Sequence, residues 1–134
     1  MLSPAIRIRI DFSDSSFVGP GKIDLLEAIR DSGSLSQAAR DLGMSYRRAW
    51  LLIDSFKYAF REPVTLATTG GKGGGGVALT SFGKGLVESY RALERDIAEI
   101  APRRLRTITD AVKPRTKAKV VAARRPLTRR TARH

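Results

Sequence analysis

The sequence predicts a mainly α-helical fold with a small β hairpin. Apolar residues recur every three to four positions in four segments, as they do on the buried face of a helix. Between the third and fourth segments, two short extended stretches flank a run of glycines, which indicates a hairpin. The 134 residues suffice for one domain with a core and a tail. We place the domain at residues 1–101 and the tail at residues 102–134.

The N-terminal segment begins with a predicted strand. In residues 5–12, AIRIRIDF, apolar and charged residues alternate, and this period of two is typical of a half-buried strand. Residues 13–19 form a polar loop that leads to Pro20, a residue favoured in the first turn of a helix. The helix is expected over residues 21–32, and Gly33 ends it.

Two short helices separated by a tight turn are predicted next. Ser34 with Gln37 three residues later is the pattern of a capping box at a helix start. Gly43 ends this helix, because glycine adopts a left-handed conformation without steric cost, and Ser45 caps a second helix over residues 46–60. This arrangement is a helix-turn-helix, whose second helix docks in the major groove of DNA. The expected inner faces comprise Leu35, Ala38, Ala39, Leu42, Met44, Ala49, Leu52, Ile53, Phe56 and Phe60.

The first turn of the second helix carries the residues expected to read DNA. Tyr46, Arg47 and Arg48 follow the Ser45 cap. Two arginines are unfavourable at a helix N-terminus, which carries the positive end of the helix dipole, whereas arginine is the commonest specific reader of guanine. We therefore interpret this turn as a DNA contact rather than an exposed basic turn without a partner. Trp50 is expected to pack against neighbouring helices.

A glycine-rich hairpin follows. The extended stretches 63–69, PVTLATT, and 77–79, VAL, flank residues 70–76, which contain six glycines and Lys72. The run is not a P-loop, because no Gly-Lys-Ser/Thr follows at the required spacing, and no strand-to-helix crossover surrounds it as in a dinucleotide fingerprint. A flexible tip with Lys72 can approach a sugar-phosphate backbone closely. The alternative is a loop without a partner, because ordering so many glycines is entropically unfavourable.

The last regular element is a helix over residues 82–101, capped by Thr80 and Ser81 and ended by Pro102. Its apolar residues are spaced by 4, 3, 4 and 3 positions, which is a heptad pattern. Two interpretations stay open with equal weight: the helix pairs with its twin in a homodimer, or it packs on its own domain. The dimerisation candidates are Leu86, Tyr90, Leu93, Ile97 and Ile100.

The positive charge of the chain is concentrated at its C-terminal end. The net charge is +12, and residues 102–134 hold 12 of the 25 Lys and Arg with a single acid, so they contribute +11. Residues 1–101 are close to neutral, with 13 basic and 12 acidic residues. A basic block of this density favours polyanions, first of all nucleic acid. The segment contains Pro114 and Pro126 and has the composition of a chain that is disordered when unbound.

Cysteine and histidine usage excludes several function classes. The chain has no cysteine, and its single histidine is the last residue, His134. We expect no catalytic residues, no metal site, no cofactor and no enzymatic activity. The N-terminus is not a secretory signal, and no apolar run is long enough to span a membrane. We expect a cytoplasmic, nucleoid-associated protein without a membrane partner.

Three motifs carry a resemblance to a known family. GSLSQAARDLGMSYRRAW, TGGKGGGG and LTSFGKGL, in this order, resemble the N-terminal DNA-binding domain of ModE-type molybdate-responsive regulators, and more distantly the LysR-type winged domain. The resemblance covers residues 5–100. It implies a bacterial transcription regulator with a winged helix-turn-helix that dimerises through its last helix and binds a palindromic operator. It also implies that Ser45, Tyr46, Arg47 and Arg48 lie on the recognition helix and Lys72 in the wing.

The chain departs from that family after the last predicted helix. Those regulators usually continue into a molybdate-binding domain of small β-barrels, whereas this chain continues into the basic tail, so we expect no molybdate site in it. Two functions are weighed: a sequence-specific regulator of double-stranded DNA, and an architectural protein that binds DNA non-specifically through its tail. The residues expected at DNA are Ser34, Ser36, Gln37, Ser45, Tyr46, Arg47, Arg48, Thr69 and Lys72.

Overall fold

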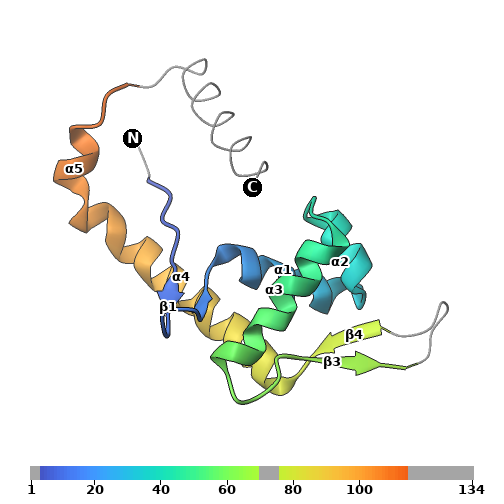
Figure 1. The fold of residues 1–134 in the computed structure, drawn as a ribbon. Coiled ribbons are helices and arrows are strands. Elements are labelled where there is room, and N and C mark those ends of the chain that lie inside the picture. Colours follow the sequence, from blue (N-terminus) through green and yellow to red (C-terminus); the bar gives the residue numbers. More distant parts are fainter. Residues whose placement is uncertain (1–3, 70–75, 115–134) are drawn as a thin grey trace. The chain divides into compact units, whose positions relative to one another are not determined.

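The structure is a computed structural model that describes residues 4–69 and 76–114 (Figure 1). Residues 5–100 form one compact unit, and the described residues from Ala101 to Pro114 belong to a second. The elements in chain order are β1 (Ile10–Asp11), β2 (Phe17–Val18), α1 (Pro20–Ser32), α2 (Leu35–Asp41), α3 (Tyr46–Ala59), β3 (Thr65–Thr68), β4 (Gly76–Leu79), α4 (Ser81–Arg104) and α5 (Arg106–Asp110).

Helix α1 is the centre of the core of residues 5–100. It begins at Pro20 and packs against α2, α3 and β4. Gly33 follows the helix in the left-handed conformation, with φ of 72°, and its N–H donates to the carbonyl oxygen of Ile29. The predicted helix and its glycine stop are confirmed. Its fully buried side chains are Ile23, Leu25, Leu26 and Ile29.

Helices α2 and α3 form the predicted helix-turn-helix. Gly43 has φ of 68°, and the N–H of Met44 donates to the carbonyl oxygen of Ala39, which closes the turn. Ala38 and Ala39 are buried and allow α2 to approach α1 and α3 closely. Leu42, expected on the inner face, is exposed. The turn is therefore sealed by the half-buried Met44 rather than by both side chains.

The N-terminal segment forms a short hairpin instead of the predicted eight-residue strand. Only Ile10 and Asp11 are in strand conformation, paired with Val18 and Phe17 of β2. Ile8 and Ile10 are half-buried, as the alternation predicted, but Ile6 is exposed. The partner strand is short because the loop closes at Ser16 and α1 begins at Pro20, which leaves only Phe17 and Val18 to pair.

Strands β3 and β4 form the predicted antiparallel hairpin, with Thr65 opposite Leu79 and Thr68 opposite Gly76. The hairpin is joined to the helices by the N–H of Val77, which donates to the carbonyl oxygen of Gly33 at 3.0 Å. A Cβ at Gly76 would lie 2.8 Å from that same oxygen, so a residue without a side chain is required where the wing meets the turn after α1. The fold is thus a winged helix-turn-helix.

Helix α4 begins as predicted and ends later than predicted. The Thr80 side chain accepts a hydrogen bond from the N–H of Gly83, which confirms the N-terminal cap. The helix passes through Pro102 to Arg104, and the N–H of Leu105 donates to the carbonyl oxygen of Ala101. Proline removes one hydrogen bond from a helix but has a helical φ itself. The expected end at Pro102 is therefore wrong.

Helix α5, Arg106–Asp110, lies in the segment predicted to be disordered. Thr109 donates its hydroxyl to the carbonyl oxygen of Leu105 at 3.1 Å. Residues 102–114 thus include helical structure, and the rest of the predicted tail lies outside the described residues. In the part of the chain that is described, no helix combines the length and apolar character needed to cross a membrane.

Candidate nucleic-acid interface

The first turn of α3 presents its basic side chains to solvent. The Ser45 hydroxyl accepts the N–H of Arg48 at 3.1 Å, so this serine caps the helix as predicted. Tyr46, Arg47 and Arg48 are exposed, and the first turn has no acidic residue. Within residues 4–69 and 76–114, neither arginine forms an ion pair. Both guanidinium groups and the positive end of the helix are thus available to an anion.

An open pocket joins the starts of α2, α3 and β4. Its volume is about 300 Å³. The structure therefore brings together three residues predicted at DNA, Ser34, Ser36 and Tyr46, with the base of the wing. Hydroxyl groups beside a basic helix start suit a sugar-phosphate backbone. The pocket is lined by Ser34, Leu35, Ser36, Tyr46, Gly76 and Val77.

The capping box predicted at α2 is only half formed. The Ser34 hydroxyl accepts the N–H of Gln37 at 3.1 Å. The Gln37 side chain does not return to Ser34, because its amide donates to Asp41 and its oxygen accepts from Arg40, both at 2.7 Å. The N–H of Ser34 instead donates to the Ser32 hydroxyl. Gln37 is thus already hydrogen-bonded within its own helix.

Only one of the two wing residues predicted at DNA lies within the described part of the chain. Thr69 is exposed at the end of the described part of the hairpin. Lys72 and the glycines at positions 70–75 lie outside the described residues, so the structure does not place them relative to the pocket.

The outer surface of α3 carries large apolar side chains. Trp50 is 49% exposed, so the expectation that it packs against neighbouring helices is wrong. Leu51 and Tyr58 are exposed as well, and the sequence reasoning did not single them out. The helical period predicts the exposure of Leu51, because this residue lies four positions after Arg47, on the side of α3 opposite the buried Ala49.

The other end of α3 is anchored by the N-terminal hairpin. The Ser16 hydroxyl donates to the carbonyl oxygen of Tyr58 at 3.0 Å, which satisfies an acceptor in the last turn of the helix. The ring of Phe60 lies between two others in edge-to-face contact. Its centre is 5.3 Å from that of Phe12 and 5.1 Å from that of Phe82. These contacts hold α3 to both the hairpin and α4, so the exposed first turn projects from a fixed base.

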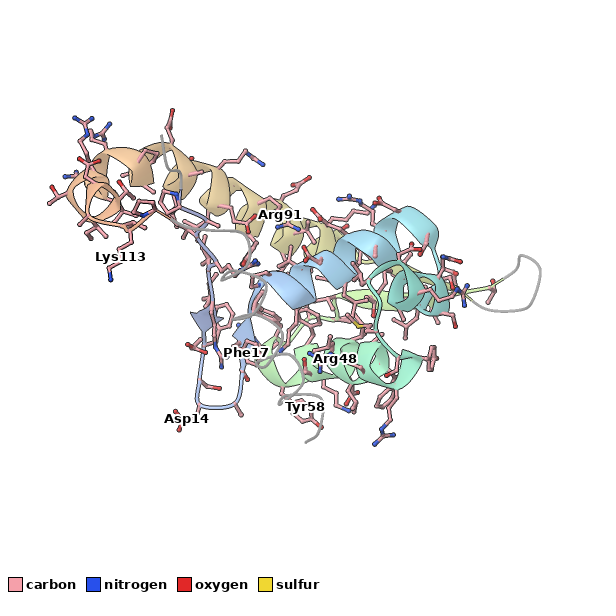
Figure 2. All side chains as sticks on the ribbon, turned by 90° about the horizontal axis from the view of Figure 1, so that it is seen from above. Asp14, Phe17, Arg48, Tyr58, Arg91 and Lys113 are labelled. Atoms are coloured by element: carbon pink, nitrogen blue, oxygen red, sulfur yellow. The ribbon has the colours of Figure 1, made fainter. Side chains whose placement is uncertain are left out.

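Lys22 of α1 is buried beneath this base. Its Nζ donates to the carbonyl oxygen of Phe17 at 2.9 Å and lies 3.9 Å from the centre of the Phe17 ring. Arg9 lies 3.8 Å from the centre of the same ring (Phe17 is labelled in Figure 2). Burial, followed by repulsion from Arg9, lowers the pKa of Lys22. The lysine is a structural cation held by a carbonyl and an aromatic face.

Arg91 connects α4 to α1 (Figure 2). Its guanidinium group donates to Asp24 and Glu27 of α1, both at 2.7 Å, and to Glu94 at 2.8 Å. The hydrogen bond from Arg91 lowers the pKa of Glu27. Because three carboxylates satisfy this arginine inside the domain, it is not available as a phosphate contact.

The predicted heptad residues of α4 have different surroundings. Tyr90 is 2% exposed and donates its hydroxyl to the carbonyl oxygen of Ile8 at 2.6 Å, and Leu86 packs against the core. Both side chains therefore make contacts within their own domain. Leu93 and Ile100 are exposed and Ile97 is half-buried. Packing on its own domain is thus observed for the first part of the predicted seam, and dimerisation through the other residues stays a prediction.

The described residues show no group of three or more potential metal ligands.

No family model matches the chain. Several curated relatives do match the chain, among them the following three. It is 40% identical over 83 residues to the molybdenum-pterin-binding protein MopB of Rhodobacter capsulatus, covering 62% of this chain and 31% of the relative. It is 39% identical over 88 residues to the molybdenum transport protein ModE of Azotobacter vinelandii, covering 66% and 33%.

The third relative is the DNA-binding transcriptional dual regulator ModE of Escherichia coli K12, 39% identical over 88 residues, with 66% of this chain and 34% of the relative covered. The chain spans about a third of the length of the curated relatives it matches. The matches cover about two thirds of this chain, in agreement with the motifs and with the winged helix-turn-helix. The chain therefore carries a ModE-type N-terminal domain.

Proposed function

We propose that this chain is a transcription regulator that binds double-stranded DNA sequence-specifically, with α3 in the major groove and the β3–β4 wing at the backbone. The observation that carries the proposal is the first turn of α3, where exposed Arg47 and Arg48 follow the Ser45 cap. Groove-docked helices use such N-terminal residues on base edges. The name of the Escherichia coli relative, a DNA-binding transcriptional regulator, supports the proposal.

Replacing Arg47 with alanine tests base reading. An arginine that pairs with guanine contributes about 1–3 kcal/mol of discrimination. We expect Arg47→Ala to weaken binding to the preferred duplex by that amount and to relax the preference at one base pair. Selection from random duplexes at fixed salt, followed by titration of the selected site, measures both effects.

Arg95→Ala is the matched control, because Arg95 is an exposed arginine on α4 away from the first turn of α3. It removes the same charge and should leave the selected sequence unchanged. An Arg47→Ala variant that selects the same sequence as the parent chain would contradict the role of Arg47 in base reading.

A second candidate function is that of an architectural protein that binds DNA through its basic tail. It is favoured by the concentration of 12 of the 25 Lys and Arg in residues 102–134. We propose that residues 1–101 are the DNA-reading domain and that the tail adds affinity without sequence preference. The two functions predict different DNA-binding behaviour after the tail is removed.

Truncation after Pro114 separates them. It leaves α4 and α5 intact and removes eight Lys and Arg without removing an acid. For a regulator we expect an unchanged preferred site, weaker binding, and a salt dependence reduced by about 0.9 in log–log slope for each phosphate that the tail no longer neutralises. Titrations of specific and scrambled duplexes at several salt concentrations measure this. A truncated chain that no longer distinguishes the two duplexes would favour the architectural function.

We also propose that the chain acts as a homodimer through the exposed and half-buried apolar residues in the second half of α4. Leu93, Ile97 and Ile100 recur at heptad spacing and are not taken up by the core. Leu86 and Tyr90 support this contact from inside each protomer, because they fix α4 to its own domain. A twofold dimer matches a palindromic site on DNA.

A further inference from the structure

We propose that Leu51, flanked by Trp50, reads the 5-methyl group of a thymine in the major groove, beside the base contacted by Arg47. The inference rests on the proposed docking of α3 in that groove. It goes beyond that docking by assigning to two apolar side chains a defined chemical group on the DNA.

Leu51 and Trp50 lie on the surface that a docked α3 would turn toward the bases. Leu51 is 47% exposed and Trp50 is 49% exposed, whereas Ala49 and Phe56 of the same helix face the core. Leu51 follows Arg47 by four residues and therefore projects from the same face one turn later. Docking would remove both apolar side chains from water, which is favourable, but any polar base edge that they cover would lose its hydrogen bonds to water, so an apolar group in the groove is the preferred partner.

The chemistry of the major groove identifies that partner. The edges of base pairs there carry hydrogen-bond donors and acceptors, and the apolar group among them is the C5-methyl of thymine. The acidic residue of α3, Asp54, is paired with Lys57 at 2.9 Å and is largely covered, so it is not free to accept from the amino group of cytosine. One turn after Arg47, the exposed side chains Trp50 and Leu51 therefore offer an apolar surface for the thymine methyl group.

The helical rise places the methyl group relative to the guanine. Four residues advance about 6 Å along a helix, and base pairs are spaced by about 3.4 Å. The thymine is therefore expected within about two base pairs of the base read by Arg47.

Replacing thymine with deoxyuridine removes only the methyl group and tests the contact. The full chain first selects its preferred duplex, and each thymine within three base pairs of the Arg47-dependent position is then replaced singly by deoxyuridine. We expect one replacement to weaken binding about fourfold, the scale of one buried methyl group. The double variant Leu51→Ala/Trp50→Ala should bind the thymine and uracil duplexes with less than a twofold difference.

Two matched variants control the experiment. Ile6→Ala removes an exposed apolar side chain from the N-terminal segment, outside the proposed DNA contacts, and should keep the fourfold discrimination. Leu51→Met retains an apolar side chain and should keep it as well. Both variants alter exposed side chains, so the fold is expected to persist.

The outcomes separate the inference from the proposed function. A chain that selects no preferred duplex contradicts the proposed function itself. A preferred duplex with no thymine near the Arg47-dependent position, or one that binds equally with uracil, overturns the inference alone. Discrimination retained by the double variant also overturns it, because the methyl group would then be read by another part of the chain.

Discussion

Gly83→Ala is expected to lower the free energy of unfolding by about 3 kcal/mol, although alanine is the better helix former. A Cβ built on Gly83 would lie 2.2 Å from the carbonyl oxygen of Val64 and 3.1 Å from its carbonyl carbon. That oxygen also accepts the N–H of Thr80 at 3.0 Å, so it cannot move without breaking the junction between the wing and α4. Overpacking typically destabilises by about 1–3 kcal/mol and by more where the neighbour is fixed backbone, which exceeds the gain of about 1 kcal/mol in helix propensity.

Gly85 provides the matched control two residues later in the same helix. A Cβ at Gly85 meets nothing within 4 Å. Gly85→Ala should therefore stabilise the chain, by up to about 1 kcal/mol, through helix propensity and a less flexible unfolded state. Urea unfolding of the two variants measures the difference. Equal effects of the two substitutions would show that α4 does not press against Val64.

The helix boundaries were predictable because they depend on local chemistry. Ser34, Ser45 and Thr80 each accept a backbone N–H three residues on, as their positions indicated. Gly33 and Gly43 adopt the positive φ that helix ends require. In each case the interacting atoms lie within a few residues along the chain, so the sequence contains the whole interaction.

Features that depend on distant partners were not predictable in the same way. The alternation in residues 5–12 indicates a strand, but its paired length is limited by β2, which has two residues. Trp50 is large and apolar, which favours burial, but no described element covers it well enough to bury it. The heptad spacing of α4 does not distinguish Tyr90, which reaches Ile8, from Leu93, which remains exposed. These outcomes depend on which surfaces meet after folding.

The start of α3 illustrates how far the candidate interface could be anticipated. Arg47 and Arg48 were expected at the surface because two cations are unfavourable at a helix N-terminus without an anionic partner. The proximity of Ser34 and Ser36 to Tyr46 and the base of the wing needed the tertiary structure, since β4 joins the turn after α1 through Val77.

Phe56→Ala is expected to destabilise the chain by about 3–5 kcal/mol, the usual range for a buried phenylalanine. Phe56 is 3% exposed on the inner face of α3, and its ring stacks with that of Phe60, with 6.4 Å between the ring centres. The Nζ of Lys22 lies 5.6 Å from its centre, so the substitution also weakens the surroundings of a buried cation. A domain of this size has a total stability of about 5–15 kcal/mol. The variant should therefore unfold at a much lower urea concentration.

Phe12→Ala is the control within the same aromatic cluster. Phe12 touches Phe60 at 5.3 Å but is half exposed, so its removal should lower stability by about 1 kcal/mol or less. Binding to the preferred duplex, measured below the unfolding transition, separates stability from recognition. Because the base of α3 determines where Arg47 and Leu51 project, Phe56→Ala should weaken specific binding more than binding to a scrambled duplex. Equal weakening on both duplexes would mean that core packing beneath α3 does not position the reading face.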